Sequence, residues 1–83
     1  MSFRVHVRVM PREGLLDPQG QAVEHALASL GFDGAGGVRI GRAIELDVAA
    51  SSADDARTRA RQMCERLLAN PVTEDFELDV EPS

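Results

Sequence analysis

Few side chains of this sequence could carry catalysis, and their spacing matches no known catalytic or metal-binding pattern. The single cysteine, Cys64, lies within an apolar helical stripe, where a thiol is more often a buried packing group than a nucleophile. His6 falls on the polar side of an alternating segment and His25 lies beside a second helical stripe, without the H-x-x-x-H spacing of a metal site. The alternating carboxylates near the C-terminus are typical of a solvated strand face. We therefore expect no catalytic residue, no cofactor-binding residue and no metal ligand on this chain.

A glycine-rich segment, residues 34–37, is the other candidate for chemistry. A phosphate-binding loop follows a strand, opens a helix and carries G-K-[ST] or G-x-G-x-x-G. Residues 34–37 instead follow a predicted helix and lead into a predicted strand. This order favours a flexible connection over a nucleotide site.

Length and charge restrict the class of protein further. With 83 residues the chain is expected to form one domain, residues 1–83, whose small core gives thin stability unless a partner subunit supplements it. Nine arginines, no lysines and 14 acidic residues give a net charge of −5, which argues against a nucleic-acid partner. No apolar stretch approaches the ~20 residues of a membrane span, so no membrane partner is expected. A lone cysteine and the absence of a signal-peptide pattern predict a cytoplasmic protein.

Hydrophobic periodicity predicts the elements that position these residues. Alternation over residues 3–10 and again over 72–80 predicts two half-buried strands. Asp17 and Pro18 predict the start of a helix that runs to about residue 30 and ends before Gly31. A second helix is predicted after Ser52, with an apolar stripe composed of Ala56, Ala60, Met63, Cys64, Leu67 and Leu68.

Residues 38–48 leave two alternatives open. Apolar side chains occupy even positions on both sides of Gly41, so a three-residue loop at 41–43 would give a hairpin with one apolar face. The alternative is one long strand that bends at Gly41 without reversing. The hairpin gives the order β-α-β-β-α-β, an α+β ferredoxin-like sandwich with two helices on one face of an antiparallel sheet. In that sheet the first strand lies centrally, and Arg4 and Arg8 face the acidic residues of its neighbours, namely Glu45, Asp47, Asp75, Glu77 and Asp79.

Several segments together resemble the PurS family, the small subunit of phosphoribosylformylglycinamidine synthase. They cover essentially the whole chain in order: Leu16-Asp17-Pro18-Gln19-Gly20, Ala22-Val23-Glu24, Val38-Arg39-Ile40-Gly41-Arg42, Ile44-Glu45-Leu46, and Cys64-Glu65-Arg66-Leu67-Leu68-Ala69-Asn70-Pro71-Val72. The L-D-P-Q-G and A-N-P-V segments are the specific ones. Arg42 departs from the family pattern, which commonly has Lys after the glycine; the charge is kept but the geometry differs.

The resemblance implies a subunit of an ATP-dependent amidoligase in purine biosynthesis. That enzyme converts formylglycinamide ribonucleotide to formylglycinamidine ribonucleotide with glutamine and ATP. The implied partners are a second copy of this chain (a homodimer or homotetramer), a glutaminase subunit and a synthetase subunit that binds ATP and Mg. The implied role is to bridge the two enzymes and to assist ammonia transfer between them.

The matched segments also imply the contact residues. These are Asp17, Pro18, Gln19, Gly20, Arg39, Gly41, Arg42, Asn70 and Pro71, of which the arginines are attractive because arginine grips carboxylates with two bonds. The same residues read equally well as helix caps and solvated turn charges. Two alternatives stand beside this role: a ferredoxin-like regulatory module that binds a small molecule, and a stand-alone small enzyme, which would need an acid–base pair that we do not find.

Overall fold

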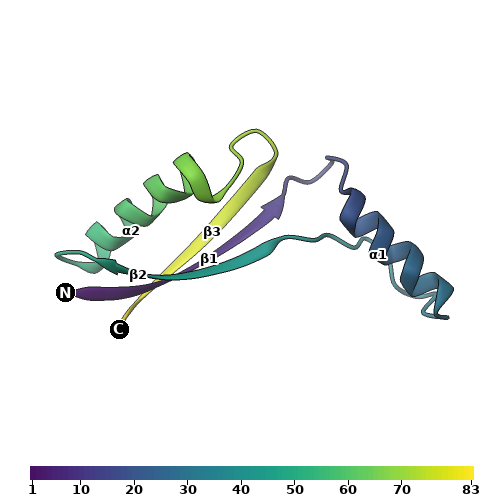
Figure 1. The fold of residues 1–83 in the computed structure, drawn as a ribbon, viewed down its shortest axis with the longest axis horizontal. Helices are drawn as coiled ribbons and strands as arrows, with labels where there is room; N and C mark the ends of the chain where they lie inside the picture. Colours follow the sequence, from purple (N-terminus) through teal and green to yellow (C-terminus); the bar gives the residue numbers. More distant parts are fainter.

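The structure, a computed structural model that describes residues 1–83, is an α+β fold built on one antiparallel sheet. Its elements follow the chain in the order strand, helix, strand, helix, π-helix, strand (Figure 1). Their bounds are β1 Ser2–Pro11, α1 Pro18–Ser29, β2 Arg42–Ala49, α2 Ala53–Met63, η1 Cys64–Leu68 and β3 Glu74–Pro82. The α+β class and both predicted helices are thus confirmed. No helix of the chain is both long enough and apolar enough to span a bilayer.

The sheet has three strands in the order β2-β1-β3, with β1 in the centre as the sequence predicted. Both neighbours run antiparallel to β1, and the register places Val5 opposite Leu46 on one side and Val80 on the other. Val7 is likewise opposite Ile44 and Leu78. Apolar residues therefore align across all three strands, which is the condition for one face of the sheet to be buried.

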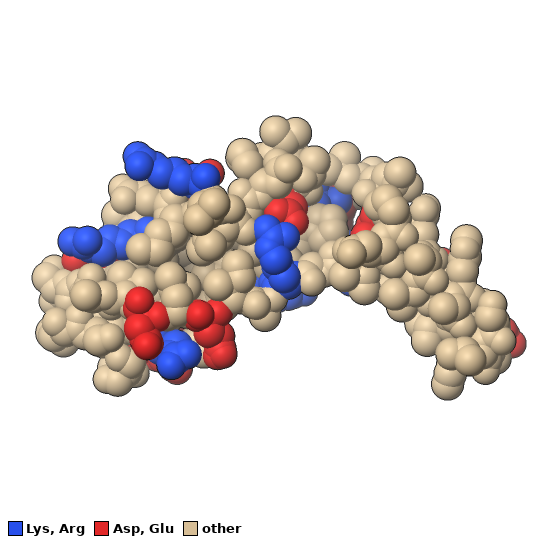
Figure 2. All heavy atoms as spheres, viewed as in Figure 1, with Lys and Arg blue, Asp and Glu red and all other residues tan.

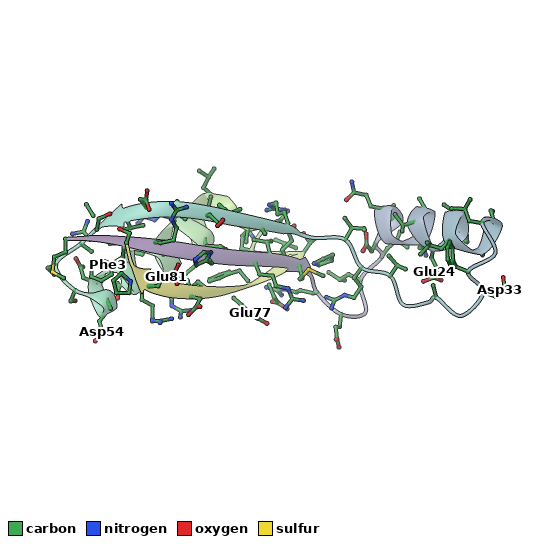
Figure 3. All side chains as sticks on the ribbon, turned by 90° about the horizontal axis from the view of Figure 1, so that it is seen from below. Phe3, Glu24, Asp33, Asp54, Glu77 and Glu81 are labelled. Atoms are coloured by element: carbon green, nitrogen blue, oxygen red, sulfur yellow. The ribbon has the colours of Figure 1, made fainter.

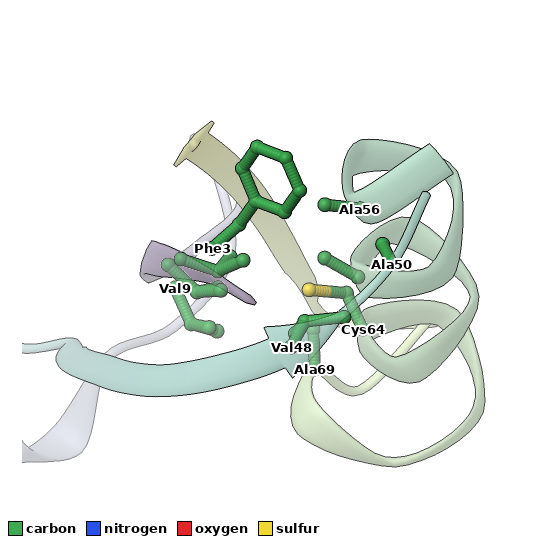
Figure 4. Close-up of a cluster of buried hydrophobic side chains, with 10 residues drawn as sticks. Phe3, Val9, Val48, Ala50, Ala56, Cys64 and Ala69 are labelled. Carbon is green, nitrogen blue, oxygen red and sulfur yellow. The ribbon is translucent and has the colours of Figure 1, made fainter. Parts of the chain in front are cut away.

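The core lies between this apolar face and α2 (Figure 4). Val5 and Val9 of β1 are completely buried, as are Ala56 and Ala60 of α2. The buried residues of α2 recur every four positions and have small side chains, so the helix backbone approaches the sheet closely. Cys64, the next residue in this row, is also buried, and that burial raises the pKa of its thiol. Cys64 is therefore a packing residue, as expected from its position in the stripe.

The opposite face of the sheet is charged and open to solvent. In Figure 3 the labelled side chains of Glu77 and Glu81 lie on the part of the molecule that contains the sheet. Arg4 contacts Asp47 at 3.1 Å and Arg8 contacts Glu77 at 3.6 Å, which confirms the predicted pairing between β1 and its neighbours. All four side chains are more than 40% exposed, so each pair contributes only about 0–1 kcal/mol.

His6 occupies the middle of this charged face and connects both outer strands. Its Nε2 lies 2.9 Å from Glu81 and its Nδ1 lies 3.5 Å from Glu45, while Arg4 is the nearby cation. The hydrogen bond with Glu81 is the main reason that the pKa of His6 is raised. The stabilisation from the charged imidazole is therefore fully present below the unfolded-state pKa of about 6.5 and is lost as pH rises through the folded-state pKa.

This gives a testable pH dependence. We expect an NMR titration of the His6 ring to give a pKa above 6.5, and thermal stability to decline as the imidazole loses its proton. Glu81→Gln should lower the pKa of His6 more than Glu45→Gln does, because Glu81 is the closer acceptor. An unshifted His6 titration in the folded protein would contradict the arrangement.

Helix α1 is where the structure departs most from the predicted sandwich. No strand and no other helix packs extensively against α1, which extends beyond the end of the sheet (Figure 1). The chain measures 51 × 26 × 14 Å and its radius of gyration is 16.3 Å, against about 12 Å for a compact domain of this length. Three strands about 4.8 Å apart are no wider than one helix of about 10 Å, and α2 already occupies that width. The prediction that both helices cover one face was therefore wrong.

Residues 38–41 differ from the hairpin prediction as well. They form no strand, and the chain enters β2 at Arg42 without reversing, as in the alternative without a hairpin. The backbone N–H of Ile40 donates to the Asp17 carboxylate, so this donor is not available to a neighbouring strand. The sheet within one chain consequently has three strands, where the β-α-β-β-α-β order predicted four.

Candidate functional site: the arm and its junction with the sheet

The part of the chain that extends from the sheet, residues 14–40, is called the arm here; the rest is called the body. The arm contains α1, and of that helix only Gly20 is buried. Its large apolar side chains are exposed to solvent; they are Leu15, Leu16, Val23, Leu30 and Phe32, with exposed fractions of 47%, 73%, 39%, 73% and 60%. A small domain rarely leaves so many large apolar side chains exposed on one segment unless another molecule covers them.

The arm also differs from the body in charge. Residues 14–38 contain no arginine and only three acidic residues, Asp17, Glu24 and Asp33. In Figure 2 the blue and red side chains gather over the sheet and α2, while the arm is almost entirely tan. Apart from Arg39 at the junction, the arm thus presents an apolar surface without arginine or lysine, which is suited to hydrophobic association rather than to binding an anion.

Asp17 connects the two chain segments where the arm joins the body. One carboxylate oxygen accepts the backbone N–H of Gly20 at 3.0 Å and caps α1, as the sequence predicted. The other oxygen accepts the N–H of Ile40 at 2.9 Å, a residue 23 positions further along the chain. These two N–H donors, with Arg39 nearby, keep the pKa of the Asp17 carboxyl below its usual range.

Gly20 and Glu24 complete the contact between α1 and the segment that precedes β2. The backbone oxygen of Val38 lies where a Cβ on Gly20 would stand, and the Asp17 carboxylate would be 2.6 Å from that Cβ. Only glycine therefore permits this close approach. One turn further along α1, the Glu24 carboxylate accepts the N–H of Val38 at 3.1 Å.

Arg39 lies at the same junction, on the segment of the arm that precedes β2. Its guanidinium donates to the backbone oxygen of Pro11 at the end of β1 and lies 4.0 Å from the Glu13 carboxylate. An open cavity of about 590 Å³ lies beside it, between residues 11–17 and residues 37–39. Arg39 thus joins the segment before β2 to the end of β1.

Arg42, the other arginine suggested as a contact residue, is bound within the chain. Its two terminal nitrogens donate to the two carboxylate oxygens of Glu74 at 2.7 and 3.0 Å. One of them also donates to the backbone oxygen of Leu68. The bonds with Arg42 lower the pKa of Glu74, and the same pairing raises the pKa of Arg42. Arg42 therefore joins the start of β2 to the turn that leads from η1 into β3.

Asn70 and Pro71 form that turn. The Asn70 side-chain oxygen accepts the N–H of Val72 at 2.9 Å, and the Asn70 N–H donates to Glu74 at 2.7 Å. The backbone oxygen of Pro71 accepts from Arg12 at 2.7 Å. The specific A-N-P-V segment thus orders the entry into β3 and connects it to the end of β1.

The structure sorts the nine suggested contact residues into two groups. Six of them, Asp17, Pro18, Gln19, Gly20, Arg39 and Gly41, lie on the arm or at its junction; Arg42, Asn70 and Pro71 lie at the turn before β3. Pro18 and Gln19 are exposed on the first turn of α1. Sequence reasoning missed Arg12, Glu24 and Glu74, because their side chains bind Pro71, Val38 and Arg42, which lie 59, 14 and 32 residues away along the chain. No group of three or more His, Cys, Asp or Glu side chains is placed to hold a metal ion.

Comparison with known proteins places this arrangement in a family. Residues 4–82 match the family model described as PurS, phosphoribosylformylglycinamidine (FGAM) synthase. The chain is 44% identical over 79 residues to the phosphoribosylformylglycinamidine synthase subunit PurS of Bacillus subtilis, covering 95% of this chain and 93% of the relative. It is 41% identical over 75 residues to the same subunit of a Synechocystis species, covering 90% and 75%.

Solved structures agree with the sequence match. The B. subtilis PurS structure superimposes with a TM-score of 0.84 at 44% identity, covering 95% of this chain and 98% of that one. A chain of the PurLQS structure from Thermotoga maritima gives a TM-score of 0.88 at 30% identity, covering 98% and 99%. The motifs at the arm junction, the course of the fold and these relatives lead to one conclusion: the chain belongs to the PurS family of phosphoribosylformylglycinamidine synthase subunits.

Proposed function

We propose that this chain is the small, non-catalytic subunit of phosphoribosylformylglycinamidine synthase and acts in purine biosynthesis by joining the enzyme's other subunits. The observation that carries this proposal is the family match, which runs over residues 4–82 and leaves almost none of the chain outside it. The Thermotoga relative of known structure is part of a complex called PurLQS. By that similarity, the partners of this chain are a synthetase subunit, which binds ATP and Mg, and a glutaminase subunit. The site of action is the cytoplasm.

The side chains of this protein indicate an organising role rather than a catalytic one. Its polar side chains form ion pairs and helix caps, and ten buried residues form a small core. The apolar side chains of the arm are the largest apolar group that lies outside this core. Such a chain contributes by placing other subunits, so that ammonia released at the glutaminase passes to the synthetase with little loss to water.

Self-association is the second part of the proposal, as a homodimer or homotetramer. The apolar side chains of the arm need a cover that the chain itself does not supply. A second copy is the natural occupant, because a self-complementary contact lets one apolar segment cover its equivalent. The absence of arginine and lysine from 14–38 avoids placing their unpaired charges in that contact.

A reconstitution assay tests the main proposal. The chain is expressed with a synthetase and a glutaminase subunit, and glutamine-dependent formation of formylglycinamidine ribonucleotide is measured with and without it. We expect the three proteins to co-purify and the glutamine-dependent rate to fall strongly when the chain is omitted, while ammonia-dependent turnover by the synthetase persists. Unchanged glutamine-dependent activity without the chain would refute the role.

A matched pair of variants tests the arm separately. Leu30 on the arm and Leu67 on η1 are both leucines and both largely exposed, at 73% and 82%. Leu30→Asp should shift the chain to monomer in sedimentation analysis, because a carboxylate would be buried in the contact. Leu67→Asp should leave the oligomer intact. If both variants remain oligomeric, the arm is not the self-association surface.

A further inference from the structure

The arm is joined to the body by only two stretches of backbone, so the fold of the body does not by itself set the direction of the arm. Residues 12–17 lead from β1 into α1, and residues 30–41 lead from α1 back into β2. Since no strand and no other helix packs extensively against α1, packing alone does not fix its orientation. Whatever sets the angle between arm and body must act at this junction.

The hydrogen bonds of Asp17 are placed to set the angle between the arm and the body. The Gly20 N–H bond holds the carboxylate on the first turn of α1, and the Ile40 N–H bond holds it on the segment that continues directly into β2. Two residues beyond Ile40, the chain is paired in the sheet, opposite Val9 of β1. The two hydrogen bonds therefore link the helix to the sheet through one side chain.

We propose that Asp17 is a positioning residue whose two backbone hydrogen bonds fix the direction of the arm relative to the sheet. Gly20 is its necessary companion, because a larger residue would collide with both Val38 and the Asp17 carboxylate. Glu24 reinforces the same link through Val38. Both Asp17 oxygens are used on backbone donors, so this role differs from a direct contact with another subunit.

The consequence for assembly rests on the proposed self-association. An arm held in one direction loses little conformational freedom when it docks, whereas a free arm must be ordered at the moment of binding. Loss of the Asp17 link should therefore weaken self-association without removing any side chain of the apolar face. A carboxylate bound to backbone donors at the base of the arm would thus control the affinity of the contact.

Asp17→Asn is the informative substitution. Asparagine is as good a helix cap as aspartate, so α1 keeps its start. Its amide has only one acceptor oxygen, however, so the N–H of Ile40 loses its partner. Gly20→Ala disrupts the same contact from the side of the helix, because the added Cβ collides with the Val38 backbone. Gly36→Ala is the matched control, because a Cβ at that position meets nothing within 4 Å.

The measurement is made on the full chain carrying Leu30→Asp, and again without it. In the Leu30→Asp background, amide exchange at Ile40 should accelerate at least tenfold with Asp17→Asn, while exchange in the middle of α1 stays unchanged. Residual dipolar couplings of α1 should no longer fit the same single orientation as the sheet. Without Leu30→Asp, both Asp17→Asn and Gly20→Ala should weaken self-association about tenfold in sedimentation equilibrium.

The outcomes separate the two proposals. An arm that keeps its orientation in Asp17→Asn overturns the role of Asp17, whatever the oligomeric state. A loosened arm with unchanged self-association overturns the coupling between arm direction and assembly. A loosened arm in a chain that is monomeric even without any substitution leaves the role of Asp17 standing and refutes self-association through the arm.

Discussion

Arg42→Glu is expected to lower the free energy of unfolding by about 1–3 kcal/mol, because it removes charge-assisted bonds and brings two carboxylates together. The lost bonds are those from Arg42 to Glu74 and to the backbone of Leu68. The Arg42 side chain is 47% exposed, which keeps the estimate below that for a buried pair. Thermal and urea denaturation should show the loss as a lower midpoint, by several degrees in the thermal scan.

The variant with the two charges exchanged is the control. Arg42→Glu combined with Glu74→Arg restores an attractive pair, so it should recover part of the lost stability. The remaining loss reflects the bonds to Leu68 and Asn70, which the exchanged pair does not rebuild. If instead Arg42→Glu leaves stability unchanged but abolishes assembly with the partner subunits, Arg42 is a contact residue, as the sequence resemblance suggested.

Gly41→Ala is expected to be comparably destabilising, by about 1–3 kcal/mol, for a steric reason. The space beside Gly41 is filled by the backbone oxygen of Val9 and the side chain of Met10, so an added Cβ forces β1 and the start of β2 apart. The backbone atom cannot yield without disturbing the sheet. Chemical denaturation of the purified chain gives the change in unfolding free energy directly.

Gly36→Ala again provides the comparison. A Cβ at Gly36 meets nothing within 4 Å, and its backbone φ is not positive, so the substitution should change stability by no more than about 0.5–1 kcal/mol. Equal losses at Gly36 and Gly41 would show that the effect belongs to glycine replacement in general. A loss confined to Gly41 would show that the close approach of β1 and the segment before β2 matters.

Local patterns in the sequence were sufficient to predict the position of most helices and strands. Alternation placed β1 correctly because a half-buried strand has a period of two, and the charged side chains of β1 predicted its acidic neighbours. The limits of α1 followed from Asp17-Pro18 at one end and Gly31 at the other, which adopts the left-handed φ of +96°. These features depend on residues within a few positions of one another, so a single sequence contains them.

The path of the chain around α1 required the three-dimensional structure. Val23, Leu27 and Leu30 recur at helical spacing, and such an apolar stripe looks the same in sequence whether its own sheet or another molecule covers it. The apolar parity of residues 38–48 is likewise compatible with a hairpin and with a chain that continues without reversing. In the folded chain the N–H of Ile40 is bound by Asp17, and that contact spans 23 residues, so no local pattern contains it.

The suggested contact residues also combine features that the sequence reveals with features that only the folded structure reveals. Their membership in specific motifs was visible in the sequence, but the partners of Arg42 and Gly41 were not, because Glu74 and Val9 are each about 32 positions away. Hydrophobic period, helix caps and turn residues are local consequences of covalent geometry and solvent exposure, and they can be read along the chain. The direction of the arm and the pairing of charges that bridge distant segments depend on which of those segments meet, and only the folded chain brings them together.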